Sequence, residues 1–115
     1  MHELSIALNI IDGVLGEAQQ RGIAEVQAIH LRVGRLSGVD KDALLFSYRV
    51  ASEDTPLVNS SLLIEDVDVI IHCPACRAER SIQSFPSLLC ADCGTAADRV
   101  IRGEELEITG LEVAA

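Results

Sequence analysis

The spacing of hydrophobic residues near the N-terminus predicts an amphipathic helix. These residues recur every three or four positions, which places them on one face of a helix. The predicted face consists of Leu4, Ala7, Leu8, Ile11, Val14, Leu15 and Ala18. Arg21 and Gly22 follow, a cation suited to the last helical turn and a glycine that ends a helix.

A second helix is expected to begin after Asp40, because a carboxylate at that place can cap the first amide groups of a helix. The side chains of this helix that could face the core are Leu44, Leu45, Tyr48 and Val50. The segment between the two predicted helices changes to a period of two from Val26 to Val33, which is typical of a strand. Ile29, Leu31 and Val33 would share one face of this strand, opposite Ala28, His30 and Arg32.

Two further segments alternate, and each changes phase once. Between residues 62 and 71, the pair Leu62 and Ile64 is out of phase with Val67, Val69 and Ile71. A β-bulge near Glu65 and Asp66 would bring both sets onto one face of a single strand. The last strand, residues 106–113, changes phase at Gly110, where a second bulge is expected.

Residues 73–97 differ from the rest of the chain because they hold all four cysteines and few apolar side chains. A segment below about 40 residues with so small a core needs a metal or disulfides to fold. The sequence therefore predicts an α+β fold, with two helices on a three-stranded sheet and an inserted four-cysteine zinc-ribbon domain. Residues 1–72 and 98–115 would form the first domain, and residues 73–97 the second.

Composition excludes several classes of partner and location. The 115 residues include 18 acidic and 9 basic side chains, a net charge of −9, which argues against nucleic-acid binding because phosphates require Lys and Arg. No apolar run approaches the ~18–20 residues needed to span a membrane, and the N-terminus lacks the pattern of a signal peptide. We therefore expect a cytoplasmic protein, in which thiols stay reduced and cysteines serve as metal ligands.

The cysteines form two pairs with the spacing of a metal site. Cys73 and Cys76 are separated by thirteen residues from Cys90 and Cys93. Two such turns facing each other predict a tetrahedral four-sulfur site suited to Zn²⁺. Because the protein fills all four positions, the zinc is expected to be structural rather than catalytic.

Three weaker interpretations of this module stay open. A redox pair would explain one CxxC motif and leave the other without a role. Iron fits the same four-sulfur geometry. His72 could be a substitute ligand, although the simpler interpretation is that it ends a strand.

The first three residues, Met1, His2 and Glu3, form a second candidate metal site. The terminal amine, the backbone amide of His2 and its imidazole can converge on one ion, and the Glu3 amide can supply a fourth nitrogen. Such a planar nitrogen set suits Ni²⁺ or Cu²⁺. The partial positive charge of the helix N-terminus opposes a bound cation by ~0.3–1 kcal/mol, so the site would release its ion readily. The simpler alternative is that His2 is a polar residue at a frayed end.

These features together resemble the HypA/HybF hydrogenase maturation proteins. The resemblance rests on MHELSIALNII at the start, LRVGRLSGVDKDAL at residues 31–44, EDVDVIIHCPAC and CADCG. It implies a nickel metallochaperone that works with the GTPase HypB and delivers Ni²⁺ to the large-subunit precursor of [NiFe]-hydrogenase. Met1, His2 and Glu3 would bind the nickel as transient cargo, and the four cysteines would hold zinc.

The resemblance also bears on single residues outside these motifs. In some members an acidic residue after the GxLSGV turn is tied to the nickel site, and Asp40 occupies that place, although helix capping is the simpler role. Many members have Glu where this chain has Arg35. This difference leaves the metal motifs unchanged, but a partner contact made by that Glu would not carry over to this chain. His30 has no candidate ligand near it in sequence and is expected to be a structural strand residue.

No nucleophile–base pair or phosphate-binding loop is visible, so the chain is not expected to be an enzyme. Two other functions are possible on the sequence alone. One is a zinc-ribbon adaptor for protein–protein contact without a metal-delivery role. The other, a nucleic-acid-binding ribbon, lacks a basic face, because Arg77 and Arg80 are balanced by Glu79 and Asp92.

Overall fold

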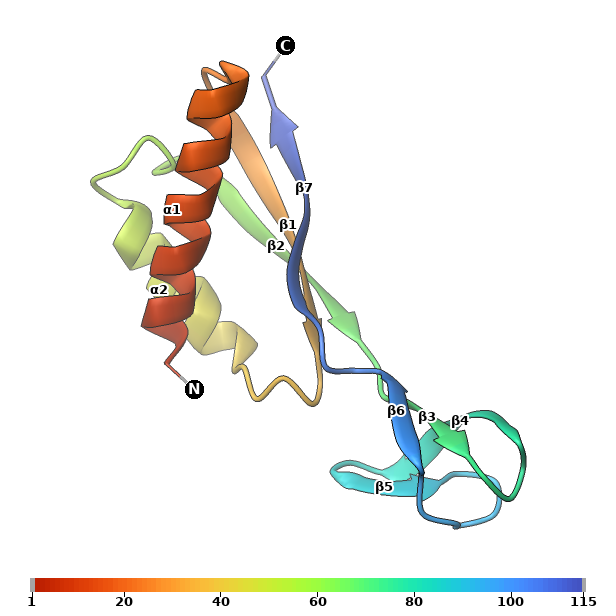
Figure 1. Cartoon of the computed structure of the whole chain (residues 1–115). Helices are drawn as coiled ribbons and strands as arrows, with labels where there is room; N and C mark the ends of the chain where they lie inside the picture. The colour runs from red at the N-terminus through yellow and green to blue at the C-terminus, as the bar shows by residue number, and fades with distance from the viewer. Residues whose placement is uncertain (1, 115) are drawn as a thin grey trace. The chain divides into compact units, whose positions relative to one another are not determined.

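The computed structural model describes residues 2–114, which form two compact units (Figure 1). The first unit contains the chain up to Arg32, Gly38–Glu65 and the chain from Glu107 onward. The second unit contains Val33–Ser37 and Asp66–Leu106. The sequence predicted that residues 73–97 form a separate domain, and that boundary stays a prediction.

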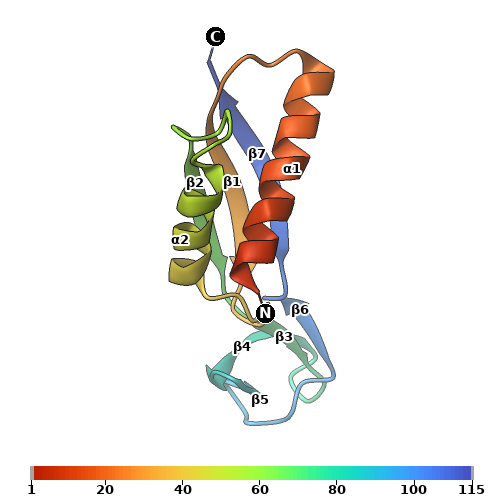
Figure 2. The ribbon, with the colours of Figure 1, turned by 90° about the vertical axis from the view of Figure 1, so that its left-hand side faces the viewer.

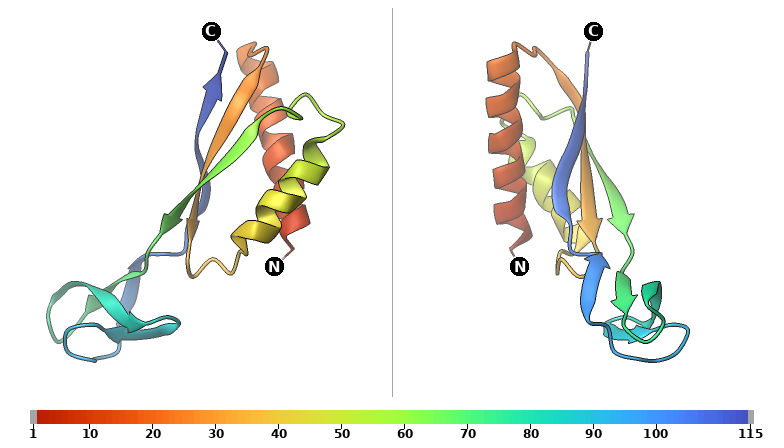
Figure 3. Two further views of the ribbon diagram at one scale, coloured as in Figure 1. Left: turned by 180° about the vertical axis from the view of Figure 1, so that it is seen from behind. Right: turned by 45° about the vertical axis from the view of Figure 1, so that its right-hand side comes forward.

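The first unit consists of two helices on a three-stranded sheet, which confirms the predicted α+β class. Helices α1 (Glu3–Arg21) and α2 (Lys41–Ser52) pack against each other and cover one face of the sheet (Figure 2). The strand order is β2 (Ser61–Val67), β1 (Val26–Gly34), β7 (Leu106–Val113). In the views of Figure 3, no helix of the described residues lies over the other face of this sheet. Among residues 2–114, neither helix offers the apolar length that a membrane span requires.

Helix α1 ends as predicted, but its buried face is rotated from the predicted one. Gly22 adopts the left-handed conformation with φ 66° and donates its amide to the carbonyls of Ala18 and Gln19. The buried side chains are Ala7, Ile10, Ile11, Val14 and Ala18. Leu4 and Leu8 were predicted to be buried and are about half exposed. Successive residues are 100° apart around a helix. The buried face is centred near Ala7 and Val14, and Leu8 therefore points about 100° away from it.

Helix α2 is capped as predicted and buries fewer residues than predicted. The Asp40 carboxylate accepts a hydrogen bond of 3.1 Å from the Ala43 amide. Leu44, Tyr48 and Ser52, spaced by one helical turn, are buried. Leu45 and Val50 are 40% and 46% exposed, so their predicted place in the core is wrong. A helix on one face of a two-layer unit buries a single stripe, and these two side chains lie outside it.

The second unit has its own four-stranded antiparallel sheet. Its order is β5 (Ser87–Cys90), β4 (Ala78–Ser84), β3 (Ile70–Cys73), β6 (Arg99–Arg102). The single strand predicted from Leu62 to Ile71 is wrong, because β2 ends at Val67 and β3 begins at Ile70 in this other sheet. The bulge predicted near Glu65 and Asp66 would fall inside β2 and stays a prediction. Val69 and Ile71, which follow β2, belong to a separate hydrophobic core. Strand β7 runs through Gly110, and the bulge predicted there stays a prediction.

The core of the second unit draws on residues that flank the cysteine segment. Val69 and Ile71 are buried together with Cys73 and Cys90. Leu36, Ile82, Leu88 and Val100 pack against them. Arg35 is held in the same unit, with its guanidinium 4.6 Å from the centre of the Phe85 ring and 3.9 Å from the Asp68 carboxylate. The core of the second unit therefore includes apolar side chains from outside residues 73–97, namely Leu36, Val69, Ile71 and Val100.

Two glycines of the second unit allow a close approach of backbone. Gly34 donates its amide to the Glu105 carbonyl at 2.7 Å, and Leu36 donates to the Gly103 carbonyl at 2.7 Å. A Cβ on Gly34 would overlap the Gly103 carbonyl and lie 2.7 Å from the Glu104 nitrogen. Gly103 itself has φ 121°, a conformation that L side chains rarely adopt. Only glycine fits at both positions.

Gly34→Ala should therefore lower the free energy of unfolding by at least ~1–3 kcal/mol, because backbone atoms must move to admit the methyl group. The matched control is Gly13→Ala in α1, where a Cβ meets nothing within 4 Å. The control should stabilise the chain by ~0.5–1 kcal/mol, since alanine is the better helix former. Chemical denaturation of the metal-loaded chain measures both, and equal effects of the two substitutions would contradict the close approach.

Candidate metal centres

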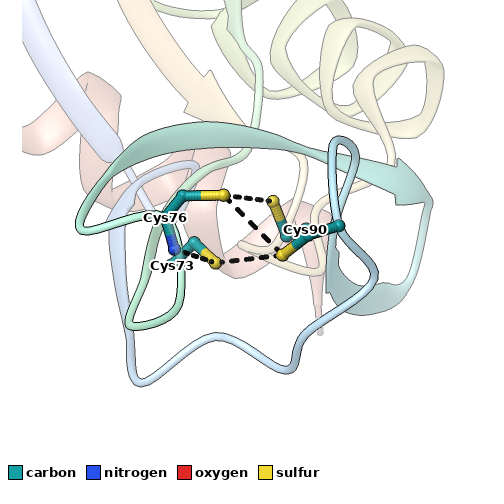
Figure 4. Close-up of side chains that lie close together, drawn as sticks. Cys73, Cys76 and Cys90 are labelled. Carbon is teal, nitrogen blue, oxygen red and sulfur yellow. Dashed lines mark hydrogen bonds between the residues drawn. The ribbon is translucent and has the colours of Figure 1, made fainter.

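The four cysteine thiols converge at one end of the second unit. Cys73 ends β3 and Cys90 ends β5, and each is followed three residues later by the second cysteine of its pair. Figure 4 shows the sulfurs of Cys73, Cys76 and Cys90 turned toward one another. The Sγ–Sγ distances are 3.5 Å for Cys73 and Cys93, 3.7 Å for Cys76 and Cys93, and 4.0 Å for Cys76 and Cys90.

These distances fit a tetrahedral metal ion. A Zn–S bond of about 2.3 Å gives a spacing of about 3.8 Å between the sulfurs of a regular tetrahedron. All four sulfurs lie within 4.8 Å of one another. All four thiols are free, and their separations far exceed a disulfide bond of about 2.05 Å. The arrangement can therefore hold an ion such as Zn²⁺, and it uses both CxxC pairs, unlike a single redox pair.

The two CxxC turns have the same backbone design. In each, the residue after the second cysteine has positive φ, 53° at Arg77 and 77° at Gly94. The amide of that residue donates to the carbonyl of the first cysteine, at 2.8 Å for Arg77 and 2.9 Å for Gly94. The Cys76 amide also donates to Cys73 Sγ at 3.3 Å. These turns aim both sulfurs of a pair at one point and stabilise negative charge on them.

The surroundings of the sulfurs favour a thiolate at Cys93 and a protonated thiol at Cys76. The Thr95 hydroxyl, 3.2 Å from Cys93 Sγ, is the main cause that lowers the pKa of Cys93 to about 6. The hydrogen bond with Cys93 is the main cause that raises the pKa of Cys76 to about 12, so the protons of the metal-free cluster are unevenly shared. The hydrogen bond with Cys76 raises the pKa of Arg80, which also pairs with Asp92 at 2.8 Å. A guanidinium there offsets part of the charge of four thiolates and one divalent ion.

Both remaining histidines outside the N-terminus are paired with carboxylates. His72 Nδ1 lies 2.9 Å from Asp98 Oδ1, a hydrogen bond that lowers the pKa of Asp98. His72 lies within β3 and is not part of the sulfur cluster, as the simpler interpretation predicted. His30 Nε2 lies 2.6 Å from Glu112 Oε2, which confirms His30 as a structural strand residue.

The second candidate site begins at His2, an exposed residue that directly precedes α1. The Ile6 amide donates to the His2 carbonyl at 3.2 Å, which starts the helical hydrogen bonds. The amides of His2 and Glu3 precede that point, so the helix offers them no acceptor. The His2 side chain makes no capping hydrogen bond. Met1 lies outside the described residues, and its predicted role stays a prediction.

The structure brings Glu3 and Asp40 together, although 36 residues separate them in the sequence. The Asp40 amide donates to Glu3 Oε2 at 3.2 Å. The Asp40 carboxylate caps α2 through Ala43, as predicted. The predicted nickel roles of Glu3 and Asp40 stay predictions. Sequence reasoning missed this contact, because no local pattern indicates which distant side chain will accept a hydrogen bond from the amide of an N-cap residue.

The chain was compared with known families and sequences. The model of the family described as "Hydrogenase/urease nickel incorporation, metallochaperone, hypA" matches residues 1–113. A hydrogenase maturation factor HypA from Chloroflexus aggregans is 44% identical over 112 residues, covering 97% of this chain and 98% of the relative. One from Streptomyces avermitilis is 38% identical over 112 residues, covering 96% and 86%.

Solved structures with the same fold exist at lower sequence identity. The solution structure of the Ni metallochaperone HypA from Helicobacter pylori is 21% identical, with a TM-score of 0.69 over 100% of this chain and 99% of that one. Another solution structure of HypA protein is 20% identical, with a TM-score of 0.73 over 99% and 97%. The similarity extends over both units of the fold.

Cobalt titration tests the sulfur site, because Co²⁺ bound to tetrahedral thiolates absorbs strongly in the visible range. The unaltered chain should take up about one Co²⁺ with that spectrum. Cys90→Ser should weaken binding by more than the roughly 10- to 100-fold typical of losing an outer-shell partner. The control His72→Asn should leave both spectrum and affinity nearly unchanged, and a loss as large as that of Cys90→Ser would make His72 a ligand.

Proposed function

Because this chain belongs to the HypA family of nickel-incorporation metallochaperones for hydrogenase maturation, we propose that it captures Ni²⁺ at Met1, His2 and Glu3. The captured ion is cargo, delivered to the large-subunit precursor of [NiFe]-hydrogenase. The capture set comprises the terminal amine, the amides of His2 and Glu3, and the His2 imidazole. This set is a planar group of nitrogens, the geometry that Ni²⁺ accepts readily.

The observation that carries the proposal is the way α1 begins. Helical hydrogen bonding starts with the Ile6 amide and the His2 carbonyl, so the amides needed for nickel are free of helical partners. The His2 imidazole is exposed and has no capping contact. Nickel capture at this point therefore requires no helical hydrogen bond to break.

The same location favours release of the ion. The helix dipole opposes a cation at the N-terminus by ~0.3–1 kcal/mol, and the Glu3 carboxylate in the first turn offsets that repulsion. An amine and an imidazole must both lose their protons to bind nickel, so affinity falls as the pH falls. Ligand exchange with an acceptor site is easier from such an exposed set than from a closed cage.

The four cysteines would hold a structural zinc ion in this function. Zn²⁺ in a site of this type contributes an apparent ~10–16 kcal/mol of binding energy to folding. Cys73 and Cys90 are fully buried in the core of the second unit, so their coordination would couple the metal directly to that core. The zinc would thus maintain the second unit, and the residues present leave no open coordination position for a substrate.

Delivery would depend on partners rather than on catalysis by this chain. The sequence has no GxxxxGK[ST] motif, so nucleotide hydrolysis would come from a partner GTPase, HypB. The net charge of −9 suits neither DNA nor RNA. We place this non-enzymatic exchange in the cytoplasm, where thiols stay reduced.

Calorimetric titration with Ni²⁺ tests the proposal on the chain with its native N-terminus. About one Ni²⁺ should bind per chain, and His2→Ala or an N-terminal extension should weaken binding by about 100-fold or more, because each removes nitrogens from a chelate. The matched control is His30→Ala, which removes a histidine paired with Glu112 and should leave nickel binding unchanged.

The other outcomes of this titration have distinct meanings. Equal binding by all variants would place the nickel elsewhere in the chain. No binding even by the native form would favour a zinc-ribbon adaptor without a delivery role.

A further inference from the structure

We propose that the Glu3 side chain positions Asp40 at the nickel site and is not itself a nickel ligand. This inference rests on the proposed function, because it assigns separate roles to two acidic residues near the same cargo site. Glu3 is the first residue of α1 and Asp40 is the N-cap of α2. Both belong to the first unit, in which the two helices pack against each other.

The contact between them completes a helix cap that α2 cannot complete alone. In a capping box, the N-cap side chain accepts from the amide three residues later, and a Glu or Gln at that position accepts from the N-cap amide. Asp40 makes the first bond, with the Ala43 amide at 3.1 Å. Ala43 has no side chain that could make the second. Glu3 Oε2 of α1 takes that place and accepts from the Asp40 amide at 3.2 Å.

This arrangement assigns the Glu3 carboxylate to the protein rather than to the metal. If Glu3 turned its carboxylate away from Asp40 and toward nickel, the Asp40 amide would lose its acceptor and α2 half of its cap; while Oε2 stays in this bond, only Oε1 is left to face a metal. The Glu3 backbone amide faces no such conflict, because it is not used in the helix. Glu3 can therefore serve the nickel set with its backbone while its side chain holds α2.

The same contact places the backbone of Asp40 beside the Glu3 side chain. One oxygen of that carboxylate caps Ala43, and a carboxylate has a second oxygen with its own lone pairs. The hydrogen bond that the Asp40 amide donates to Glu3 ties the start of α2 to the start of α1, so Asp40 is kept beside a residue of the proposed nickel site. Asp40 would thus add an oxygen ligand, and Glu3 would fix where that oxygen lies.

Two substitutions at Glu3 separate a positioning role from a ligand role. Glu3→Gln and Glu3→Ala both remove the negative charge, but only Gln keeps a side-chain oxygen that accepts from the Asp40 amide. Glu3→Gln should therefore bind Ni²⁺ about two- to tenfold more tightly than Glu3→Ala, the range expected for one hydrogen bond. If the Glu3 carboxylate is a ligand, both variants bind equally weakly and the inference is overturned.

Asp40 supplies the second arm of the experiment. Asp40→Asn keeps a good N-cap and loses the carboxylate. In that background the difference between Glu3→Gln and Glu3→Ala should disappear, because Glu3 acts on nickel through Asp40. A difference that persists at full size would overturn the inference.

Amide hydrogen exchange of the nickel-free chain checks the contact without reference to nickel. Exchange at the Asp40 amide should be faster in Glu3→Ala than in the unaltered chain, and Glu3→Gln should restore its protection; equal exchange in all three would overturn the inference. Failure of the proposed function is separate, since it would appear as unchanged nickel binding in His2→Ala.

Discussion

The structure of the second unit depends on four sulfurs that lie within 4.8 Å of one another. Three of the sulfur pairs are 3.5–4.0 Å apart, which suits a shared divalent ion, because four thiolates so close together repel one another unless a cation lies among them. Two of these sulfurs, on Cys73 and Cys90, are also the centre of a small core. Metal coordination at these cysteines would therefore be coupled directly to the hydrophobic packing of this unit.

The metal site proposed in the first unit has a different requirement, because it must release its ion to an acceptor. A ligand set at a helix start is exposed, lacks helical partners and lies at the positive end of the helix dipole. The sulfur site is built from two rigid turns, whereas the nitrogen set uses the end of the chain. One family fold thus combines a site suited to retention with a site suited to transfer.

Acidic residues near the transfer site have structural duties that constrain their chemistry. Asp40 caps α2, and Glu3 accepts the Asp40 amide. A side chain already committed to a hydrogen bond can bind a metal only by giving up that bond or by using a second lone pair. In the proposed nickel site, the helix packing that joins α1 to α2 would therefore also decide which acidic oxygens are available to the ion.

The sequence alone determined the elements and motifs that depend on local chemistry. The cap at Asp40, the stop at Gly22 and the two CxxC turns all follow from interactions within a few residues. Tertiary structure decided the rest, because a stripe of hydrophobic residues does not say how much of it will be covered: Leu8, Leu45 and Val50 stay exposed. Likewise, the chain passes from the first sheet to the second between Val67 and Ile70, which only the pairing of distant strands reveals. The hydrogen bond between Glu3 and Asp40 arises only when two helices pack, so no local pattern predicts it.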